Sequence, residues 1–506
     1  MKKIKQLLLT TFAVVTILTL SACTNKSGIS LQLENGDQDF LTSEVLNITN
    51  QTAFEAMLKS HDEFGINNGI TALLDLVDYE LLKGKFELNQ EEIQKQVENY
   101  KEIYEEFDTF LITNGFETEE NFVRYLELTK LREEAGRATI EITDEEIQLA
   151  YEAQHGTNDE APALADVKEE LREGLINQQL TMATLEKELA RLRQEAGFVI
   201  LDNYLQAQYI SLLESYEIAV DEVFVSSSKT STTLAAKMGE REYTADQLFN
   251  ELIPLTGLST AIALVDPAIL KQNYEITDEA VNEVIDSLKV QLGDQFYPVM
   301  LQYYGLNGEQ EIRDYITLVQ LQEAAFKEKH KPTEARLQEL YEKYEPEISA
   351  RHILVEDEAQ AQDIINQLEN AEDKEATFIE LAKEHGTDAT ATEGGDLGSF
   401  GRDVEFLEEF KTAVFDLNVG EFTTTPVKTE AGYHVIYVYD METKGSFEEM
   451  REKLQEKEFA RLNTATNIER LLLEERGAVN LRFTNPSIQA RYEAIAASIK
   501  ESANEE

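Results

Sequence analysis

The sequence is poor in the features that cross-link proteins, hold them in membranes or carry nucleophilic catalysis. It has a single cysteine, Cys23, so no disulfide can form within the chain. Beyond the first 22 residues we find no apolar run long enough to cross a membrane, which takes about 20 residues. Neither a Ser–His–Asp signature nor a phosphate-binding glycine loop is present. These absences exclude several common classes of enzyme and membrane protein.

Positive charge is also scarce. The 506 residues include 45 Lys and Arg against 98 Asp and Glu, a formal net charge of −53. Such a chain repels phosphate backbones and anionic headgroups, so we expect no nucleic acid partner. The acidity is spread along the whole chain. Charge of this kind usually serves solubility, and attraction of basic, unfolded clients is the alternative interpretation.

The N-terminus has the pattern of a secretory signal. Three lysines within the first five residues precede an apolar stretch of 14 residues, 7–20. The stretch ends in Leu20-Ser21-Ala22-Cys23, which resembles the bacterial lipobox. The resemblance implies a signal peptide over 1–22, lipidation of Cys23 and anchoring at the extracytoplasmic face of the bacterial cell membrane. The alternative is a leftover thiol beside an ordinary cleavage site.

The chain contains an internal repeat that is interrupted once. Residues 76–83 match 264–271 at an offset of 188, and 115–151 match 305–341 at an offset of 190. Val167 then matches Met450 at an offset of 283. Because the offset rises from 190 to 283, the second copy carries about 93 additional residues, the size of a small domain. Further on, 197–199 match 477–479 at an offset of 280.

Both copies show helical periodicity. Asn89 and Thr143 precede acidic first turns as helix N-caps do, and long amphipathic helices are predicted over 164–194 and 446–475. A chain of this length should hold about three domains. The predicted organisation is a linker at 23–35, a helical domain at 36–225, a linker at 226–237, a second helical domain at 238–346 plus 442–500, an inserted domain at 347–441, and an acidic tail at 501–506.

The inserted segment has a different pattern from its host. Its predicted elements are a strand at 348–355, helices at 358–370 and 378–384, a glycine turn at 394–400 followed by a short extended segment, a helix at 406–415 and a closing strand at 432–438. The order β-α-α-β-α-β indicates an α+β fold in which helices pack on a sheet.

Three segments of the insert carry a resemblance to the parvulin-type prolyl isomerases: residues 351–355, the turn at 394–400 and the strand at 432–436. The whole plan resembles the PrsA-type foldase lipoproteins and, more distantly, the SurA chaperones. In these families an isomerase domain loops out of a helical chaperone host. The resemblance implies α-helical chaperone domains in tandem and an α+β parvulin domain with an antiparallel or mixed four-stranded sheet. The family usually has one helical host, so the first copy has no implied role.

The resemblance also implies the site residues. Those that match the catalytic positions are His352, Asp388, Thr429 and His434, and those that match the proline-binding positions are Leu397, Phe406 and Phe410. Period-2 alternation places each histidine on one face of its strand, where they could share a polar network. Phe406 and Phe410, four residues apart, are predicted to share one helical face. The histidines could instead only hold the sheet together, and the two phenylalanines could be plain core.

Two features depart from the family pattern. Asp388 stands where some parvulins have cysteine, so we expect no nucleophilic role there. Phe406 stands where methionine is usual, and the spacing from Phe400 to Phe410 is one residue longer than usual. No tight metal-ligand spacing occurs, and we expect neither metal nor cofactor.

Three functional hypotheses follow. The first is a lipid-anchored foldase that isomerises Xaa–Pro bonds in unfolded exported polypeptides and chaperones them. The second is a non-catalytic holdase with a passive parvulin-like arm, and the third is a surface scaffold. The two histidines and the glycine turn favour the enzyme, because a passive arm has no need of them.

Overall fold

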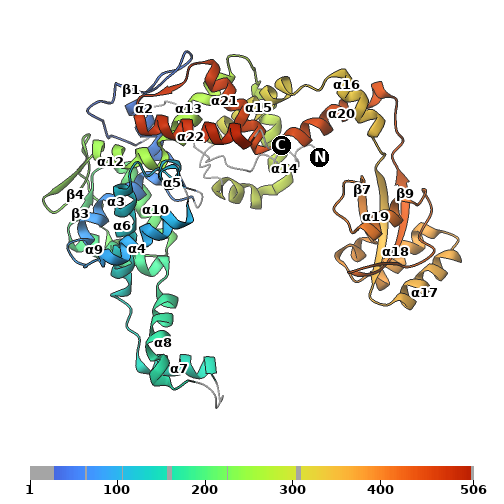
Figure 1. The fold of residues 1–506 in the computed structure, drawn as a ribbon, viewed down its shortest axis with the longest axis horizontal. Coiled ribbons are helices and arrows are strands. Elements are labelled where there is room, and N and C mark those ends of the chain that lie inside the picture. Colours follow the sequence, from blue (N-terminus) through green and yellow to red (C-terminus); the bar gives the residue numbers. More distant parts are fainter. Residues whose placement is uncertain are drawn as a thin grey trace. The chain divides into compact units, whose positions relative to one another are not determined.

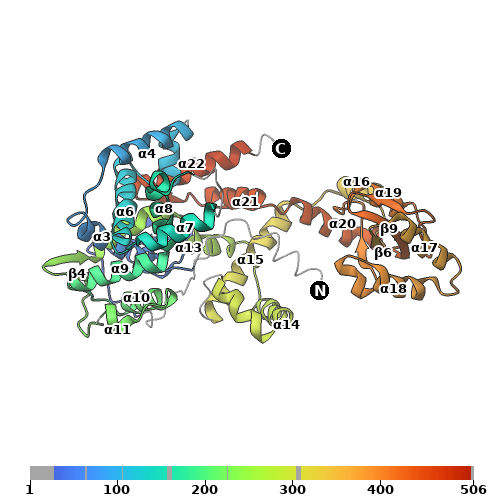
Figure 2. The same ribbon diagram turned by 90° about the horizontal axis from the view of Figure 1, so that it is seen from below.

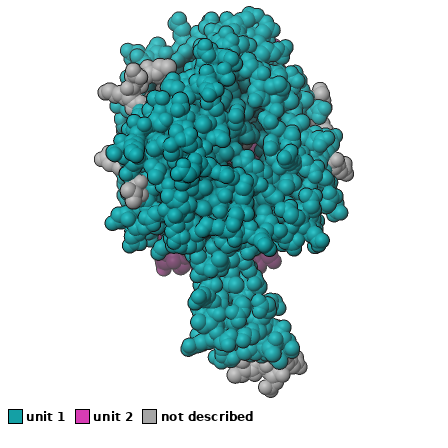
Figure 3. All heavy atoms as spheres, turned by 90° about the vertical axis from the view of Figure 1, so that its left-hand side faces the viewer, with its two compact units in different colours: residues 1–329, 463–506 teal, residues 330–462 magenta. Residues whose placement is uncertain are grey.

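A computed structural model describes residues 28–62, 65–104, 106–155, 162–224, 226–303 and 309–502. They form two compact units (Figures 1 and 3). Unit 1 comprises residues up to 329 together with 463 onward, and unit 2 comprises residues 330–462. The predicted signal peptide and Cys23 lie outside the described residues.

Unit 1 is built from helices of both sequence repeats (Figures 1 and 2). The first repeat supplies α2 (Asn50–Lys59), α3 (Asn68–Leu82), α4 (Gln90–Ile103), α5 (Phe107–Thr113), α6 (Glu119–Arg137), α7 (Asp144–His155), α8 (Leu164–Gln179), α9 (Met182–Glu195), α10 (Asn203–Ser215) and α11 (Val220–Val223). The second repeat supplies α12 (Ala245–Leu252), the π-helical turn η1 (Ile253–Gly257), α13 (Leu258–Leu270), α14 (Asp278–Tyr303), α15 (Glu309–Lys329), α21 (Ala465–Ala478) and α22 (Pro486–Ser502). The predicted caps are present: Asn89 accepts from the Glu91 amide, and Thr143 from the Glu146 amide.

Two small antiparallel sheets join the repeats. Their strands are β1 (Asp39–Thr42), β2 (Ile48–Thr49), β3 (Phe198–Ile200), β4 (Leu234–Met238), β5 (Arg241–Thr244) and β10 (Arg482–Phe483), in the orders β10-β1-β2 and β3-β4-β5. Leu41, near the start of the first repeat, pairs with Phe483 at the end of the second. Ile200, at the end of the first repeat, pairs with Ala236 at the start of the second. Each repeat therefore completes its sheet with a strand of the other.

The strand exchange gives the two repeats one hydrophobic core. A single cluster of buried side chains runs from Leu31 through Leu73 and Leu205 to Val265 and Ile488. The compact units therefore do not coincide with the predicted helical domains at 36–225 and 238–346 plus 442–500. The predicted linkers also differ from the structure, because Leu31 and Leu33 are buried and β4 occupies the end of 226–237.

Two buried ion pairs occupy equivalent positions in the repeats. Asp78 on α3 accepts from Arg193 on α9, with Oδ1 2.7 Å from Nε. Asp266 on α13 accepts from Arg476 on α21, with Oδ1 2.8 Å from Nε. The two aspartates are 188 residues apart and the two arginines 283 apart, the offsets found in the sequence. A buried charge needs a partner, so each repeat keeps both members of the pair.

The helix bounds also show where the repeat is interrupted. In the first repeat, α7 and α8 form a hairpin that projects from the core of unit 1 (Figures 1 and 3). Its counterparts in unit 2 are α16 (Glu334–Lys343) and α20 (Phe447–Leu462). The α8 and α20 bounds differ by 283 residues, and so do the caps Asp202 and Asn485. The offset of 280 after the helices is therefore wrong, and 283 continues to the end of the repeat.

One segment of unit 1 has the length and apolarity of a membrane span, contrary to the sequence analysis. It is Ala245–Leu270, which comprises α12, η1 and α13, and 56% of its most apolar window is buried inside the protein. Leu248, Leu252 and Val265 from this segment lie in the shared core. Packing in the shared core therefore explains why this segment is apolar.

Unit 2 consists of the α16–α20 hairpin and an α+β domain. The sheet has the order β7-β6-β9-β8 with every pair antiparallel, and its strands are β6 (Ile348–Val355), β7 (Asp396–Phe400), β8 (Val427–Thr429) and β9 (Gly432–Met441). The helices are α17 (Glu358–Glu369), α18 (Lys374–His385), the 3₁₀ turn η2 (Ala389–Glu393) and α19 (Glu408–Phe415). Helices α17 and α18 cover one face, around Ile353 and Val435, and α19 packs on the other, around Ala350 and Ile436. The predicted four-stranded α+β fold is confirmed.

Candidate active site

The two histidines of unit 2 lie together on the sheet face that α19 covers. His352 is on β6 and His434 on β9, the two central strands. In the antiparallel register His434 pairs with Leu354, so His352 and His434 are diagonal neighbours on one face. Both side chains are buried, with 8% and 6% of their surface exposed. The alternation in the sequence predicted this placement.

Hydrogen bonds join four of the predicted residues into one chain. His352 Nε2 lies 2.9 Å from Asp388 Oδ2, and His352 Nδ1 lies 3.2 Å from His434 Nδ1. At the far end, His434 Nε2 lies 2.8 Å from the hydroxyl of Thr429.

The chain has one consistent direction. An ionised carboxylate only accepts, so His352 donates its Nε2 proton to Asp388. A neutral His352 then accepts at Nδ1 from the Nδ1 proton of His434. His434 in turn accepts at Nε2 from the Thr429 hydroxyl. The Thr429 oxygen itself accepts a hydrogen bond from the Ala431 amide at 3.2 Å. This arrangement satisfies every buried polar atom of the two imidazoles and fixes both tautomers.

Burial keeps both imidazoles neutral. The pKa of His434 falls from its ordinary value of 6.5 to about 4, because burial disfavours the charged ring and a charged His352 would repel it. Burial also lowers the pKa of His352, against the attraction of Asp388. Near neutral pH the site therefore holds one carboxylate charge and two uncharged rings.

An aromatic wall borders the two histidines. The Phe410 ring on α19 stands edge-on to His352 at 5.6 Å and to His434 at 5.2 Å between centroids. Phe406 stands edge-on to Phe410 at 5.3 Å and to Phe400 at 5.1 Å. Phe410 is buried, whereas Phe406 and Leu397 are half-buried and pack against the same cluster. An apolar ring can be held against such a surface.

One prediction about this wall is wrong. The sequence placed Phe406 and Phe410 on one helical face, but α19 begins at Glu408, and Phe406 lies in the loop before it. The first turn of α19 is Glu408 and Glu409, and acidic side chains favour a helix N-terminus at that place. The two rings still meet because the loop folds Phe406 back onto Phe410.

The glycine turn fixes β7 and η2 beside His352. Gly395 has φ +73°, and a Cβ there would lie 2.0 Å from the His352 carbonyl oxygen. Only glycine fits such a close approach. The His352 amide donates to the Gly395 carbonyl at 2.8 Å, and Asp396 accepts from the Gly398 amide at 2.9 Å. The turn therefore holds β6 and, with it, the histidine pair.

Thr390 is a member of the network that the sequence analysis missed. Its hydroxyl lies 3.0 Å from Asp388 Oδ2 and 3.2 Å from His352 Nε2. The signal for it is weak, because a threonine two residues after an aspartate in a polar loop is common. Across the described ranges, 28–502 with their gaps, no group of three or more His, Cys, Asp or Glu residues could hold a metal ion.

Comparisons with known proteins find relatives of this chain. Residues 350–440 match the family model of the PPIC-type PPIase domain, the rotamase family. The foldase protein PrsA of Geobacillus kaustophilus is 40% identical over 212 residues, which are 42% of this chain and 72% of that protein. PrsA of Bacillus subtilis is 32% identical over 220 residues, 44% of this chain and 72% of that protein. The crystal structure of Bacillus subtilis PrsA covers 51% of this chain and 98% of its own, with 27% identity and a TM-score of 0.30.

The chain belongs to the PrsA foldase family. It carries a peptidyl-prolyl cis–trans isomerase domain and acts in protein folding. The matched residues, 350–440, coincide closely with the predicted insert at 347–441. The relatives account for less than half of this chain, which is longer than they are because its helical host is duplicated.

Proposed function

We propose that unit 2 binds Xaa–Pro segments of unfolded exported polypeptides and isomerises the prolyl bond, while unit 1 holds the client. We further propose that a lipid on Cys23 keeps the protein at the extracytoplasmic face of the cell membrane. A diacylated cysteine provides at least two acyl chains, enough for stable anchoring. The proposal includes no cofactor and no nucleic acid.

The observation that carries the catalytic proposal is a continuous hydrogen-bond chain, from Thr429 to Asp388, beside an aromatic wall. Rotation about an Xaa–Pro bond meets a barrier of about 18–20 kcal/mol, which arises from amide resonance. Resonance places negative charge on the carbonyl oxygen, and water stabilises that charge. A pocket that removes this water favours the twisted, less polar amide, so no covalent bond needs to break.

Each pocket residue has a role in this proposal. Phe410, Phe406 and Leu397 hold the proline ring and exclude water from the amide. The imidazoles of His352 and His434 form the floor, uncharged and fixed in orientation. Asp388 is a positioning residue, since it accepts the His352 proton and thereby sets the direction of the whole chain.

Holding the client is the second part of the function. Unit 1 duplicates the helical host, and its first copy carries the bare α7–α8 hairpin where the second copy carries the isomerase domain. Because the first copy has no isomerase domain, its contribution in this proposal is binding alone.

The experiment measures both activities on the full chain. We expect acceleration of cis–trans exchange in a panel of Xaa–Pro peptides and, separately, suppression of aggregation of an unfolded client. Suppression without any acceleration across the panel would replace the enzyme with the non-catalytic holdase. Acceleration without suppression would remove the client-holding role of unit 1.

A further inference from the structure

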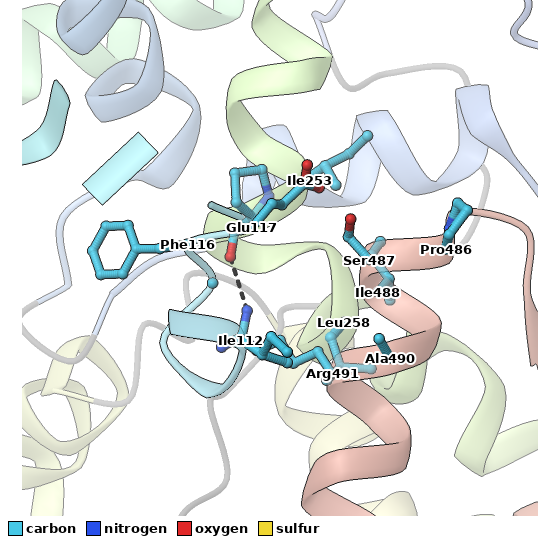
Figure 4. A pocket seen from close by; sticks show the side chains of 12 residues that line it. Ile112, Phe116, Glu117, Ile253, Leu258, Pro486, Ser487, Ile488, Ala490 and Arg491 are labelled. Carbon is cyan, nitrogen blue, oxygen red and sulfur yellow. Dashed lines mark hydrogen bonds between the residues drawn. The ribbon is translucent and has the colours of Figure 1, made fainter. Parts of the chain in front are cut away.

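Unit 1 contains a hollow of about 220 Å³ where segments of the two repeats meet (Figure 4). The first repeat contributes Ile112 from the last turn of α5 and Phe116 from the connection between α5 and α6. The second repeat contributes η1, with Ile253 and Pro254, and the first turns of α22, with Arg491. The hollow is therefore lined by both repeats.

Most of its lining is apolar. Leu258 and Ile488 are buried in the wall, with 6% and 4% of their surface exposed, and Ile253 is 8% exposed. The volume suits one large apolar side chain. Removing such a side chain from water is favourable.

Arg491 is the one cation among the described residues that line the hollow, and no described carboxylate forms an ion pair with it. Its Nη1 donates to the Pro254 carbonyl at 2.8 Å, as the dashed line in Figure 4 marks. Its Nε is buried and has no partner. Burial lowers the pKa of Arg491, and no carboxylate of the described ranges acts against that effect. By contrast, the buried Arg193 and Arg476 each pair with an aspartate.

A half-buried cation without a carboxylate partner is unexpected in so acidic a chain. Asp and Glu outnumber Lys and Arg by 98 to 45, so a carboxylate partner for Arg491 would be easy to supply. Burying an unpaired charge is unfavourable, and a carboxylate from outside relieves it with a charge-assisted hydrogen bond. Within the described chain, Nη2 of Arg491 makes no hydrogen bond and is left for such a group.

The backbone around Arg491 is closely fitted. Gly115 has φ +82°, and a Cβ there would lie 2.3 Å from the Pro254 carbonyl oxygen and 3.0 Å from Arg491 Nη1. Only glycine lets these two groups meet at this point. The π-helical turn of η1 carries Pro254 to the same place, and such turns are frequent at functional sites.

We infer that this hollow binds a segment of unfolded polypeptide in which a large apolar side chain is followed by an acidic residue. The apolar side chain enters the hollow, and the carboxylate pairs with Arg491. This inference rests on the client-holding part of the proposed function and names the sequence class that unit 1 holds.

Two other residues sharpen the inference. Glu117 also lines the hollow but is exposed, so it weakens the attraction for an acidic segment without neutralising Arg491. At the offset of 283, the counterpart of Arg491 in the first repeat is Gln208, which carries no charge. We therefore expect one such site per chain.

Fluorescence anisotropy with the full chain tests the inference. The probes are proline-free hexapeptides, labelled with fluorescein and blocked at the C-terminus, with Phe-Asp, Phe-Asn or Ala-Asp at the centre. We expect one Phe-Asp peptide to bind per chain. Its Kd should be at least tenfold lower than that of the Phe-Asn or the Ala-Asp peptide. Arg491→Met should abolish the preference for Phe-Asp over Phe-Asn and leave Phe-Asn binding within twofold. Retained Phe-Asn binding also shows that this variant is folded.

Two exposed positions keep the test decisive if Arg491→Met fails to fold. Ala490 lies at the opening on α22, and Ala490→Leu should fill the hollow and weaken both Phe peptides at least tenfold. Glu117→Gln should tighten Phe-Asp binding alone. Arg482→Met, which removes an exposed cation outside the hollow, is the matched control and should change nothing.

Equal binding of Phe-Asp and Phe-Asn by the wild type would overturn the inference, as would unchanged Phe-Asp binding by Ala490→Leu. Isomerisation of an Xaa–Pro peptide, measured on the same variants, should not change. A wild type without isomerase activity would refute the catalytic proposal and leave the anisotropy result to decide the hollow.

Discussion

Asp388→Asn separates catalysis from packing in unit 2. Asp388 Oδ2 accepts from His352 Nε2 at 2.9 Å and from the Thr390 hydroxyl at 3.0 Å. An asparagine oxygen in the same place can accept from both, so the change removes the charge and little else. Hydrogen bonds to charged groups contribute about 1.5–3 kcal/mol, against about 0.5–1.5 for neutral ones. The difference, about 1–1.5 kcal/mol, is what the charge of Asp388 contributes to holding His352 in its orientation. Losing it corresponds to roughly a tenfold loss of kcat/KM.

The assay is cis–trans exchange of a short Xaa–Pro peptide with the full chain. Circular dichroism and urea unfolding confirm that the variant is folded. Asp363→Asn, an exposed carboxylate on α17, is the matched control and should keep kcat/KM within twofold. Unchanged kcat/KM in a folded Asp388→Asn would refute the positioning role of this carboxylate.

Four further predictions follow. Cys23→Ala should move the protein from the membrane fraction into the medium or leave it unprocessed. The free energy of unfolding of unit 2 should fall by roughly 1–2 kcal/mol between pH 7 and pH 4, because unfolded His434 binds a proton near pH 6.5 and the folded residue only near pH 4. Arg476→Met should destabilise unit 1 by about 3–5 kcal/mol, since Asp266 is left buried and unpaired. Replacing residues 344–446 with 156–163, the connection between α7 and α8, should leave a helical protein that unfolds cooperatively.

Each of these has a measurement that can contradict it. Normal processing with full membrane retention of Cys23→Ala would refute the lipid anchor. For the pH effect, urea midpoints of His434→Gln should vary less with pH than those of the wild type, and equal variation would assign the effect to other groups. Urea unfolding of Arg476→Met within 0.5 kcal/mol of the wild type, roughly the effect of an ordinary surface change, would contradict the buried-pair argument. A disordered circular dichroism spectrum of the shortened chain would contradict the insertion.

The sequence was most informative where local pattern and chemistry coincide. Alternation alone places His352 and His434 on inward faces, and three motifs in order identify the isomerase domain. The repeat offsets of 188 and 283 predicted equivalent positions that the structure fills with the same ion pair. Each repeat needs both members of its Asp–Arg pair, because either residue buried alone is unfavourable.

Other features depend on contacts that a linear pattern does not contain. The exchange of β3 and β10 between repeats is a long-range pairing of short strands, so the sequence suggested two separate helical domains instead. The predicted long helices each break in two, at Thr181 and Thr464, where a threonine hydroxyl caps the next helix. Thr390 joins the site because it lies in η2, whose turn brings its hydroxyl to His352.

The protonation of the two buried histidines tests the direction of the hydrogen-bond chain most directly. NMR of the full chain with ¹⁵N-labelled imidazoles reports the tautomer and charge of each ring. At pH 7 we predict two neutral rings, with the proton of His352 on Nε2 and that of His434 on Nδ1. A charged ring at either position, or the opposite tautomers, would contradict a chain that runs from Thr429 to Asp388.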